Sequence, residues 1–249
     1  MLLALEQHNI EIYRNRDAWM HKPVLRDVYS EFYRQIAQRL STGTHGIRAE
    51  LGSGMGNIKR FIPDCRTTDL FPNPWLDQQE NAYALTFADE SVADLILFDV
   101  WHHLEHPTAA LQEFHRVLEP GGRVILFEPA VSLLGRLLYG AFHHEPLGLS
   151  ERIGWETPED FSPDTPGYYA AQGNATRMFV WGEAQGRLDG WRVEEVTALS
   201  SLSYFASGGF SKPQCYPDAW LPFLLTVDRW LSKWPKLFAA RLIVVLEKE

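Results

Sequence analysis

Three glycines at alternating positions, Gly52, Gly54 and Gly56, stand between two acidic residues, Glu50 and Asp69. Glycines in a turn let the backbone approach a ligand that any Cβ atom would push away. A carboxylate at the end of the following strand is placed to accept hydrogen bonds from ribose hydroxyls. These residue types in this order indicate a nucleoside-containing cofactor that lies across the start of an α/β sheet.

The spacing of the glycines argues against a dinucleotide. A dinucleotide fingerprint reads G-x-G-x-x-G, with the pyrophosphate on a helix N-terminus, whereas residues 50–56 read E-x-G-x-G-x-G. A carboxylate at Glu50 suits an amine better than a pyrophosphate. This favours S-adenosylmethionine (SAM), which has an amino-acid end and no phosphate. A glycine-rich turn without any ligand is the alternative for this motif taken alone.

Histidines form the second group, because imidazole titrates near neutral pH and can take a proton from an oxygen nucleophile. His102, His103 and His106 directly follow an apolar run that is typical of a buried parallel strand. Ligands of open parallel sheets bind outside the carboxyl ends of the strands, which places this triplet near the cofactor. His143 and His144 stand in an irregular segment that could fold over the same opening.

Each histidine group has a structural alternative. His102, His103 and His106 could bind a metal or begin a helix, but neighbouring residues cannot all point one way, and we expect no metal site. His143 and His144 could belong to a loop that merely carries polar residues. The catalytic candidates are therefore His102, His103, His143 and His144.

Four other side chains are candidates for contact with the cofactor. Asp99, at the end of the apolar run, could face the methionine end of SAM or the substrate, or it could cap the next helix. Tyr13, Arg14 and Trp19 could close over SAM, because an aromatic ring attracts a sulfonium. For Trp19 burial in the core is the favoured interpretation, because aromatic residues at helical spacing usually pack inward.

Hydrophobic periodicity predicts the elements that position these residues. In the first half, strands are expected at 47–51, 66–70, 93–100 and 123–128, and helices at 11–40 (broken at Pro23), 57–62 and 108–118. This alternation predicts a parallel, doubly wound sheet. In the second half, helices are expected at 176–188 and 217–233, and strands that pair antiparallel at the sheet edge at 191–199 and 241–249.

Composition narrows the function classes. The chain has 249 residues, 45% of them hydrophobic, which is enough for one α/β domain with insertions. A net charge of −9 gives no electrostatic support to nucleic-acid binding. Two distant cysteines provide neither a disulfide framework nor a metal site. With no signal peptide and no apolar run of transmembrane length, we expect a cytoplasmic protein.

Four blocks in residues 46–129 together resemble the class I SAM-dependent methyltransferases, in particular the small-molecule branch known as the type 11 methyltransferase domain. Residues 50–56 are similar to its SAM-binding motif, and Asp69 stands where its ribose-binding acid stands. Residues 81–94, N-A-Y-A-L-T-F-A-D-E-S-V-A-D, resemble its adenine-side segment. Residues 114–122, F-H-R-V-L-E-P-G-G, resemble the block before its fifth strand.

The departures from the family pattern are small. Asn81 replaces the usual Asp, but its amide can both donate and accept hydrogen bonds. Thr86 replaces the usual Pro. No N-P-P-Y-like motif follows Phe98 and Asp99, which argues against the amine-methylating nucleic-acid branch.

The resemblance implies a Rossmann-like methyltransferase fold: an α/β, doubly wound, mostly parallel seven-stranded sheet. It implies an enzyme, a transferase that uses SAM and releases S-adenosylhomocysteine. The residues expected to contact the cofactor are Glu50, Gly52, Ser53, Gly54, Gly56, Asp69, Leu70, Asn81, Ala82, Asp99 and Val100. We expect one domain over residues 1–249. It is made of an N-terminal helical cap (1–45), a SAM-binding core (46–129), an insertion with a helix (130–190), and antiparallel edge strands (191–249). A helical insertion between these edge strands, at about 200–240, is expected to form a substrate lid.

The acceptor is expected to be a small molecule that is methylated on oxygen, with a saccharide or glycan precursor as the preferred class. The acidic net charge and the polar, aromatic insertion favour this class, as does a loose resemblance of residues 208–213, G-G-F-S-K-P, to methyltransferases of bacterial surface-polysaccharide pathways. A non-catalytic SAM-binding protein, a nucleotide-dependent oxidoreductase, and methyl transfer to carbon or nitrogen are the alternatives. The oligomeric state is not predicted.

The helix expected at 217–233 is rich in tryptophan and carries lysines at its end. Such a helix could lie on a membrane surface and would then suit a lipid-linked substrate. Packing on the domain or on a second subunit is favoured instead, because Asp218 and Asp228 dilute the basic face.

Overall fold

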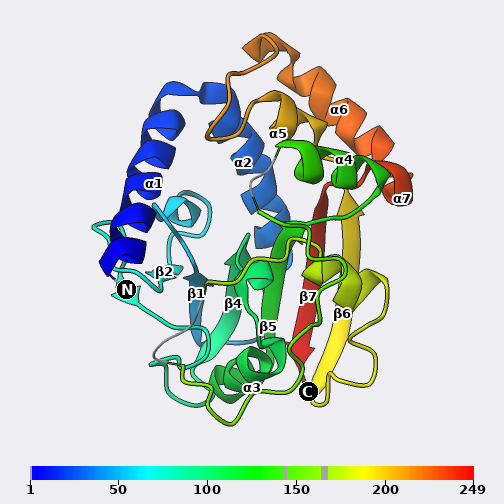
Figure 1. Ribbon diagram of the computed structural model, residues 1–249. Helices are drawn as coiled ribbons and strands as arrows, with labels where there is room; N and C mark the ends of the chain where they lie inside the picture. Colours follow the sequence, from blue (N-terminus) through cyan, green and yellow to red (C-terminus); the bar gives the residue numbers. More distant parts are fainter. Residues whose placement is uncertain (1, 143–144, 164–167) are drawn as a thin grey trace.

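The computed structural model describes residues 2–142, 145–163 and 168–249. Its centre is a seven-stranded sheet in the order β3-β2-β1-β4-β5-β7-β6 (Figure 1). β1 to β5 pair in parallel, and β7 runs antiparallel between β5 and β6. This confirms the expected doubly wound fold. The strands are β1 (Ile47–Leu51), β2 (Arg66–Asp69), β3 (Gln78–Gln79), β4 (Val92–Phe98), β5 (Leu118–Pro129), β6 (Trp191–Leu199) and β7 (Arg241–Lys248).

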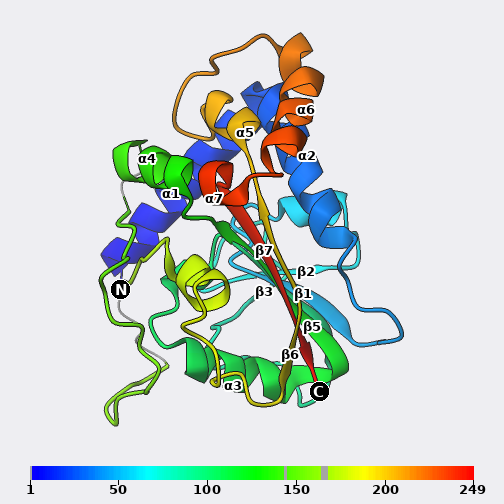
Figure 2. The same cartoon turned by 90° about the vertical axis from the view of Figure 1, so that its right-hand side faces the viewer.

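Helices cover both faces of the sheet and gather at one end of it. Figures 1 and 2 place α4, α5, α6 and α7 together at one end of the molecule and α3 at the other. The helices are α1 (Leu2–His21), α2 (Pro23–Ala37), α3 (Pro107–Val117), α4 (Leu133–Phe142), α5 (Leu202–Ala206), α6 (Leu221–Leu231) and α7 (Pro235–Phe238). Three short 3₁₀ turns lie at Asn57–Arg60, Trp101–His103 and Asp218–Trp220, and a single π-helical turn lies at Thr176–Val180.

The apolar run of β4 is nearly continuous because its two faces belong to different cores. Leu95 and Leu97 pack with residues of α3 on one face. Ile96 and Phe98 pack with residues of α2 on the other. A parallel strand that is covered on both faces has little room for polar side chains, which explains why this segment could be predicted from sequence. Its buried Asp94 accepts hydrogen bonds from the Ser41 N–H and from Arg48.

Two expected helices are much shorter than predicted. After the glycine turn there is only the 3₁₀ turn Asn57–Arg60, because Pro63 follows closely and disfavours a helical conformation in the residue before it. In place of a helix at 176–188 there is the π-helical turn Thr176–Val180. Gly182 and Gly186, with φ of 85° and 74°, take the chain out of helical conformation directly after it.

The antiparallel pairing of β7 determines which residue reaches the cofactor edge of the sheet. Because β7 runs opposite to β5, its first residue, Arg241, pairs with the last residue of β5, Pro129. Arg241 therefore lies at the carboxyl ends of the parallel strands, where ligands of this fold class bind. None of the helices in the described ranges is both long and apolar enough to cross a membrane.

Candidate functional site

The glycine turn after β1 adopts a backbone that only glycine tolerates well. Gly52, Gly54 and Gly56 have φ values of 70°, 53° and 69°. A Cβ atom on Gly52 would lie 2.3 Å from a methyl of Val100, whereas one on Gly54 would meet no atom within 4 Å. The N–H of Gly54 donates to Asp69 Oδ2 at 3.1 Å, so the turn and the end of β2 are held together.

Glu50, the second-last residue of β1, is a buried carboxylate, and one of its oxygens accepts no hydrogen bond from the described residues. Its side chain is 1% exposed, and Oε2 has no hydrogen-bond partner among the described residues. Burial raises the pKa of Glu50 to about 7, although hydrogen bonding with Ser53 and Tyr33 opposes the shift. An orphaned carboxylate oxygen of this kind is suited to receive a cationic group.

A cavity of about 260 Å³ opens beside this carboxylate. Five of the residues expected to contact the cofactor line it: Glu50, Gly52, Ser53, Gly54 and Asp99. The rest of the lining was not predicted and comes from several elements: Ile12, Asn15, Tyr29, Tyr33, Met55, Asn57, Phe98, Tyr204 and Phe210. No local signal in the sequence marked these residues as cavity residues.

An ion pair lies at the inner end of this cavity. Asp99, with a left-handed φ of 56°, accepts a hydrogen bond from the guanidinium of Arg241. Arg241 is 2% exposed, and its guanidinium carbon lies 4.8 Å from the ring centre of Tyr204 and 5.6 Å from that of Phe32. The alternative role for Asp99, capping the next helix, is not seen: the side chain pairs with Arg241, and the 3₁₀ turn Trp101–His103 has no side-chain cap. Arg241 was not predicted, because it lies 142 positions from its partner.

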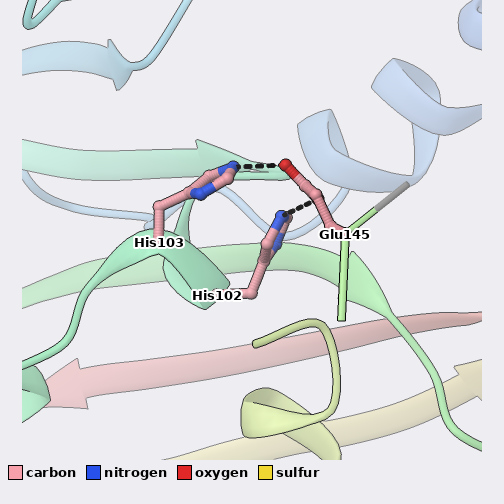
Figure 3. Close-up of side chains that lie close together, drawn as sticks. All are labelled: His102, His103 and Glu145. Carbon is pink, nitrogen blue, oxygen red and sulfur yellow. Dashed lines mark ion pairs between the residues drawn. The ribbon is translucent and has the colours of Figure 1, made fainter. Parts of the chain in front are cut away.

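His102 and His103 turn toward one carboxylate, that of Glu145 (Figure 3). The His102 and His103 Nε2 atoms lie 3.4 Å and 3.6 Å from Glu145 oxygens, and the two ring centres are 4.2 Å apart. The 3₁₀ turn Trp101–His103 brings the rings of His102 and His103 together, whereas His106 packs against Phe161, so the three histidines do not all point one way, as expected. Glu145 was not singled out from the sequence.

The other ring nitrogen of each histidine is also occupied. His102 Nδ1 donates to Glu128 Oε2 at 2.6 Å, and His103 Nδ1 donates to the carbonyl of Tyr169 at 2.9 Å. Burial lowers the pKa of His102, but the buried Glu128 carboxylate outweighs this and raises it to about 10. Burial and the charge of His102 lower the pKa of His103.

The remaining candidates lie elsewhere. His106 is buried against Phe161, with ring centres 4.8 Å apart, and precedes α3. His143 and His144 lie outside the described residues. Trp19 is buried with its edge on Tyr29, which agrees with the core interpretation.

Comparison with known proteins identifies the fold family of this site. Residues 63–126 match a family model described as a methyltransferase domain. Over 96% of its length the chain superposes on a SAM-dependent methyltransferase of Thermotoga maritima, described as a possible histamine N-methyltransferase, with a TM-score of 0.52 at 14% identity and 99% of that chain covered. Residues 63–126 thus match a methyltransferase domain, and the chain as a whole has the fold of the class I SAM-dependent methyltransferases.

Two other solved structures share the methyltransferase fold. A chain from the complex between the Haloferax volcanii Trm112 methyltransferase activator and a methyltransferase gives a TM-score of 0.54 at 16% identity, with 98% of this chain and 96% of that chain covered. The geranyl diphosphate C-methyltransferase of Streptomyces coelicolor, solved with S-adenosylhomocysteine, gives 0.51 at 9% identity, with coverages of 88% and 76%. No curated protein matches the chain.

The cavity of this methyltransferase fits SAM. The orphaned Oε2 of Glu50 suits the ammonium of the methionine end, and the open space at Gly54 admits a ligand against the backbone. Asp69, at the end of β2, is the residue that would accept the ribose hydroxyls.

The other predicted cofactor contacts surround this cavity. Asn81 donates to the Pro163 carbonyl at 2.5 Å and accepts from the Tyr83 N–H at 3.0 Å, so both ends of its amide are engaged. The six predicted contacts outside the cavity lining are Gly56, Asp69, Leu70, Asn81, Ala82 and Val100, and their contact with SAM stays a prediction.

Proposed function

We propose that this methyltransferase acts on a hydroxyl oxygen of a small-molecule acceptor. The observation that carries the proposal is the convergence of His102, His103 and Glu145: the two histidines closely follow Asp99, which lines the cavity, although the three residues of the cluster do not line it themselves. SAM, when bound, supplies an electrophilic methyl group on its sulfonium. A neutral hydroxyl must lose its proton to attack such a group, so a polar cluster at the acceptor end serves oxygen methylation.

The residues of the chain position the reactants and exclude water. Glu50 binds the ammonium of the cofactor, and Asp69 its ribose. Tyr204 and Phe210 line the cavity from the segment between β6 and β7, which supports the expected role of that segment as a lid. At the acceptor end, the hydrogen bond from Nδ1 of His103 to a backbone carbonyl leaves the Nε2 electron pair directed at the cluster.

A saccharide or glycan precursor is the acceptor class we propose. Sugars are bound by aromatic rings and by hydrogen bonds from side chains such as Asn, Gln and Glu, and this site offers both kinds of group. Phe210, which lines the cavity, belongs to the segment 208–213 that resembles methyltransferases of surface-polysaccharide pathways.

Methyl transfer from labelled SAM to a saccharide-containing cell extract tests this function. The labelled product is expected to be a methyl ether, identified by mass spectrometry and by release of the methyl group with hydriodic acid. His103→Gln should lower turnover at least about a hundredfold with SAM affinity unchanged, while His21→Gln, at an exposed position, should match the unmodified protein. Label on nitrogen or carbon would contradict the proposal, and SAM binding without transfer to any acceptor would indicate a non-catalytic protein.

The acceptor is further proposed to be lipid-linked, because one end of the molecule has an exposed apolar face. Trp220, Phe223, Trp230 and Trp234 are exposed; Phe223 and Trp230 lie on α6, Trp220 ends the 3₁₀ turn before it, and Trp234 precedes α7. Leu133, Leu137 and Leu237 of the neighbouring α4 and α7 are exposed as well. The solvent-exposed face of a surface helix is usually polar. Because the exposed residues of α6, α4 and α7 are instead apolar, this surface favours contact with a bilayer.

The charges around this face favour an anionic bilayer. Its exposed cations are Arg136, Arg229, Lys233 and Lys236. Asp228, which in the sequence dilutes the basic face, is buried and accepts hydrogen bonds from Ser200, Leu202 and Ser203. Asp218, near Trp220, stays exposed, so the face carries four cations and one of these two aspartates, and it is net positive although the chain carries −9 overall.

Sedimentation with vesicles tests the membrane contact. The protein is expected to sediment with vesicles of phosphatidylglycerol and phosphatidylcholine and to stay in solution with phosphatidylcholine alone. Arg229→Glu should weaken binding several-fold by removing one cation and adding an anion, whereas Arg60→Glu, at an exposed position on the 3₁₀ turn after β1, should not. Absence of binding, or self-association through the apolar face, would contradict the proposal.

A further inference from the structure

The cluster at the acceptor end has the geometry of a metal site. His102 Nε2, His103 Nε2 and a Glu145 oxygen lie within 4.8 Å of one another (Figure 3). Ligand atoms bonded to one zinc ion at about 2.1 Å lie about 3.4 Å apart in a tetrahedral site. The two histidine–carboxylate distances, 3.4 Å and 3.6 Å, are already close to that separation.

The hydrogen bonds behind the cluster are those that metal ligands require. A metal-binding histidine usually donates its other ring N–H to a carboxylate or a backbone carbonyl, which fixes the ring and its tautomer. His102 donates Nδ1–H to Glu128 at 2.6 Å, and His103 donates Nδ1–H to the Tyr169 carbonyl at 2.9 Å. Both Nε2 atoms thus face the Glu145 carboxylate, that of His102 at Oε2 and that of His103 at Oε1.

The carboxylates of this arrangement are themselves held in place. Glu128 Oε1 accepts from the backbone N–H groups of Val100 and Trp101, at 2.8 Å and 2.7 Å. Gln172 donates to Glu145 Oε2 at 2.8 Å. Rigidly held ligands need little rearrangement to bind an ion.

We propose that His102, His103 and Glu145 bind one divalent transition-metal ion of the zinc type. Two imidazoles and one carboxylate suit such an ion and leave a coordination position open. Because the ligands sit at the acceptor end, the open position takes the acceptor hydroxyl oxygen; this role rests on the proposed function. With the ion bound, His103 is a ligand and its Nε2 no longer accepts a proton; coordination would instead lower the pKa of the hydroxyl, whose proton would pass to water.

Cobalt binding is the direct test. The full-length protein without a histidine tag is treated with chelator, dialysed, and titrated with Co²⁺, whose visible absorption reports coordination; Zn²⁺ is then added as competitor. We expect one equivalent of Co²⁺ to bind and Zn²⁺ to displace it. Glu145→Gln and His103→Gln should each raise the dissociation constant at least tenfold.

Matched variants keep the result interpretable. Glu156→Gln and His21→Gln change the same residue types at exposed positions and should bind Co²⁺ like the unmodified protein. SAM binding by Glu145→Gln and His103→Gln verifies that these variants are folded. Absence of Co²⁺ binding, or equal affinity in Glu145→Gln, would overturn the metal site.

The metal site and the proposed function fail in different ways. If Co²⁺ binds as expected but labelled methyl is found on nitrogen or carbon, the oxygen-methylation proposal is wrong and the metal site stands. If methyl ethers form at an undiminished rate in protein shown by elemental analysis to contain no metal, the role of the ion at the acceptor is wrong.

Discussion

Glu50→Gln is expected to lower the affinity for SAM at least tenfold and to abolish its pH dependence. The substitution keeps the shape of the side chain but removes the charge that would meet the ammonium of the methionine end. An ion pair made in a buried site loses much more on removal of one partner than an exposed pair does. Calorimetric titration with SAM measures the change.

The sign of the pH dependence follows from the raised pKa of Glu50, about 7 in the free protein. SAM favours the ionised carboxylate, so its affinity should rise about tenfold between pH 6 and pH 8, as the ionised fraction grows from about one tenth to about nine tenths. The stability of the free protein changes the other way. A carboxyl whose pKa is raised on folding contributes less as pH increases from its unfolded value of 4.5 through about 7.

Glu156→Gln is the matched control, because it removes an exposed carboxylate of the same type. It should retain both the affinity and the pH dependence of the unmodified protein. If Glu50→Gln binds SAM with unchanged affinity, or keeps a tenfold rise between pH 6 and pH 8, Glu50 does not hold the ammonium.

Arg241→Met is expected to lower the free energy of unfolding by about 3 kcal/mol, because it leaves Asp99 without its cationic partner. Asp99 is 32% exposed, which keeps the effect at the lower end of the range for buried pairs. Loss of the contacts between the guanidinium and the rings of Phe32 and Tyr204 adds to it. Urea denaturation measures the change.

A double-variant cycle separates the ion pair from packing. Asp99→Asn with Arg241→Met removes both charges and should be more stable than Arg241→Met alone, because no unpaired carboxylate is left. If the double variant is no more stable than the single one, packing of the guanidinium in its aromatic surroundings accounts for the effect, and the ion pair does not.

The strands near the cofactor were predictable because their signals are local. β1 occupies the expected residues 47–51, and β4 lies within two residues of the expected run 93–100. Burial on both faces favours a nearly continuous apolar segment, here interrupted only by Asp94, and such a segment can be recognised without knowing its neighbours. The antiparallel edge formed by β6 and β7 was also found as expected.

The length of short helices was less predictable, because a few residues decide it. An amphipathic pattern predicted a helix after the glycine turn, but Pro63 and the short distance to β2 leave room only for a 3₁₀ turn. The same applies after Val180, where two glycines with positive φ replace the expected helix by turns.

The sequence by itself determined the cofactor end of this protein: the fold class, the glycine turn, and the positions of Glu50 and Asp69 at the ends of adjacent strands. These features lie within about twenty residues of one another, and backbone geometry relates them directly. Only the tertiary structure decided the contacts between distant segments. It pairs Asp99 with Arg241 across the sheet, brings Glu145 to His102 and His103, and turns Asp228 inward from the tryptophan-rich face. Contacts between distant segments depend on how the whole chain packs, and no local spacing encodes them.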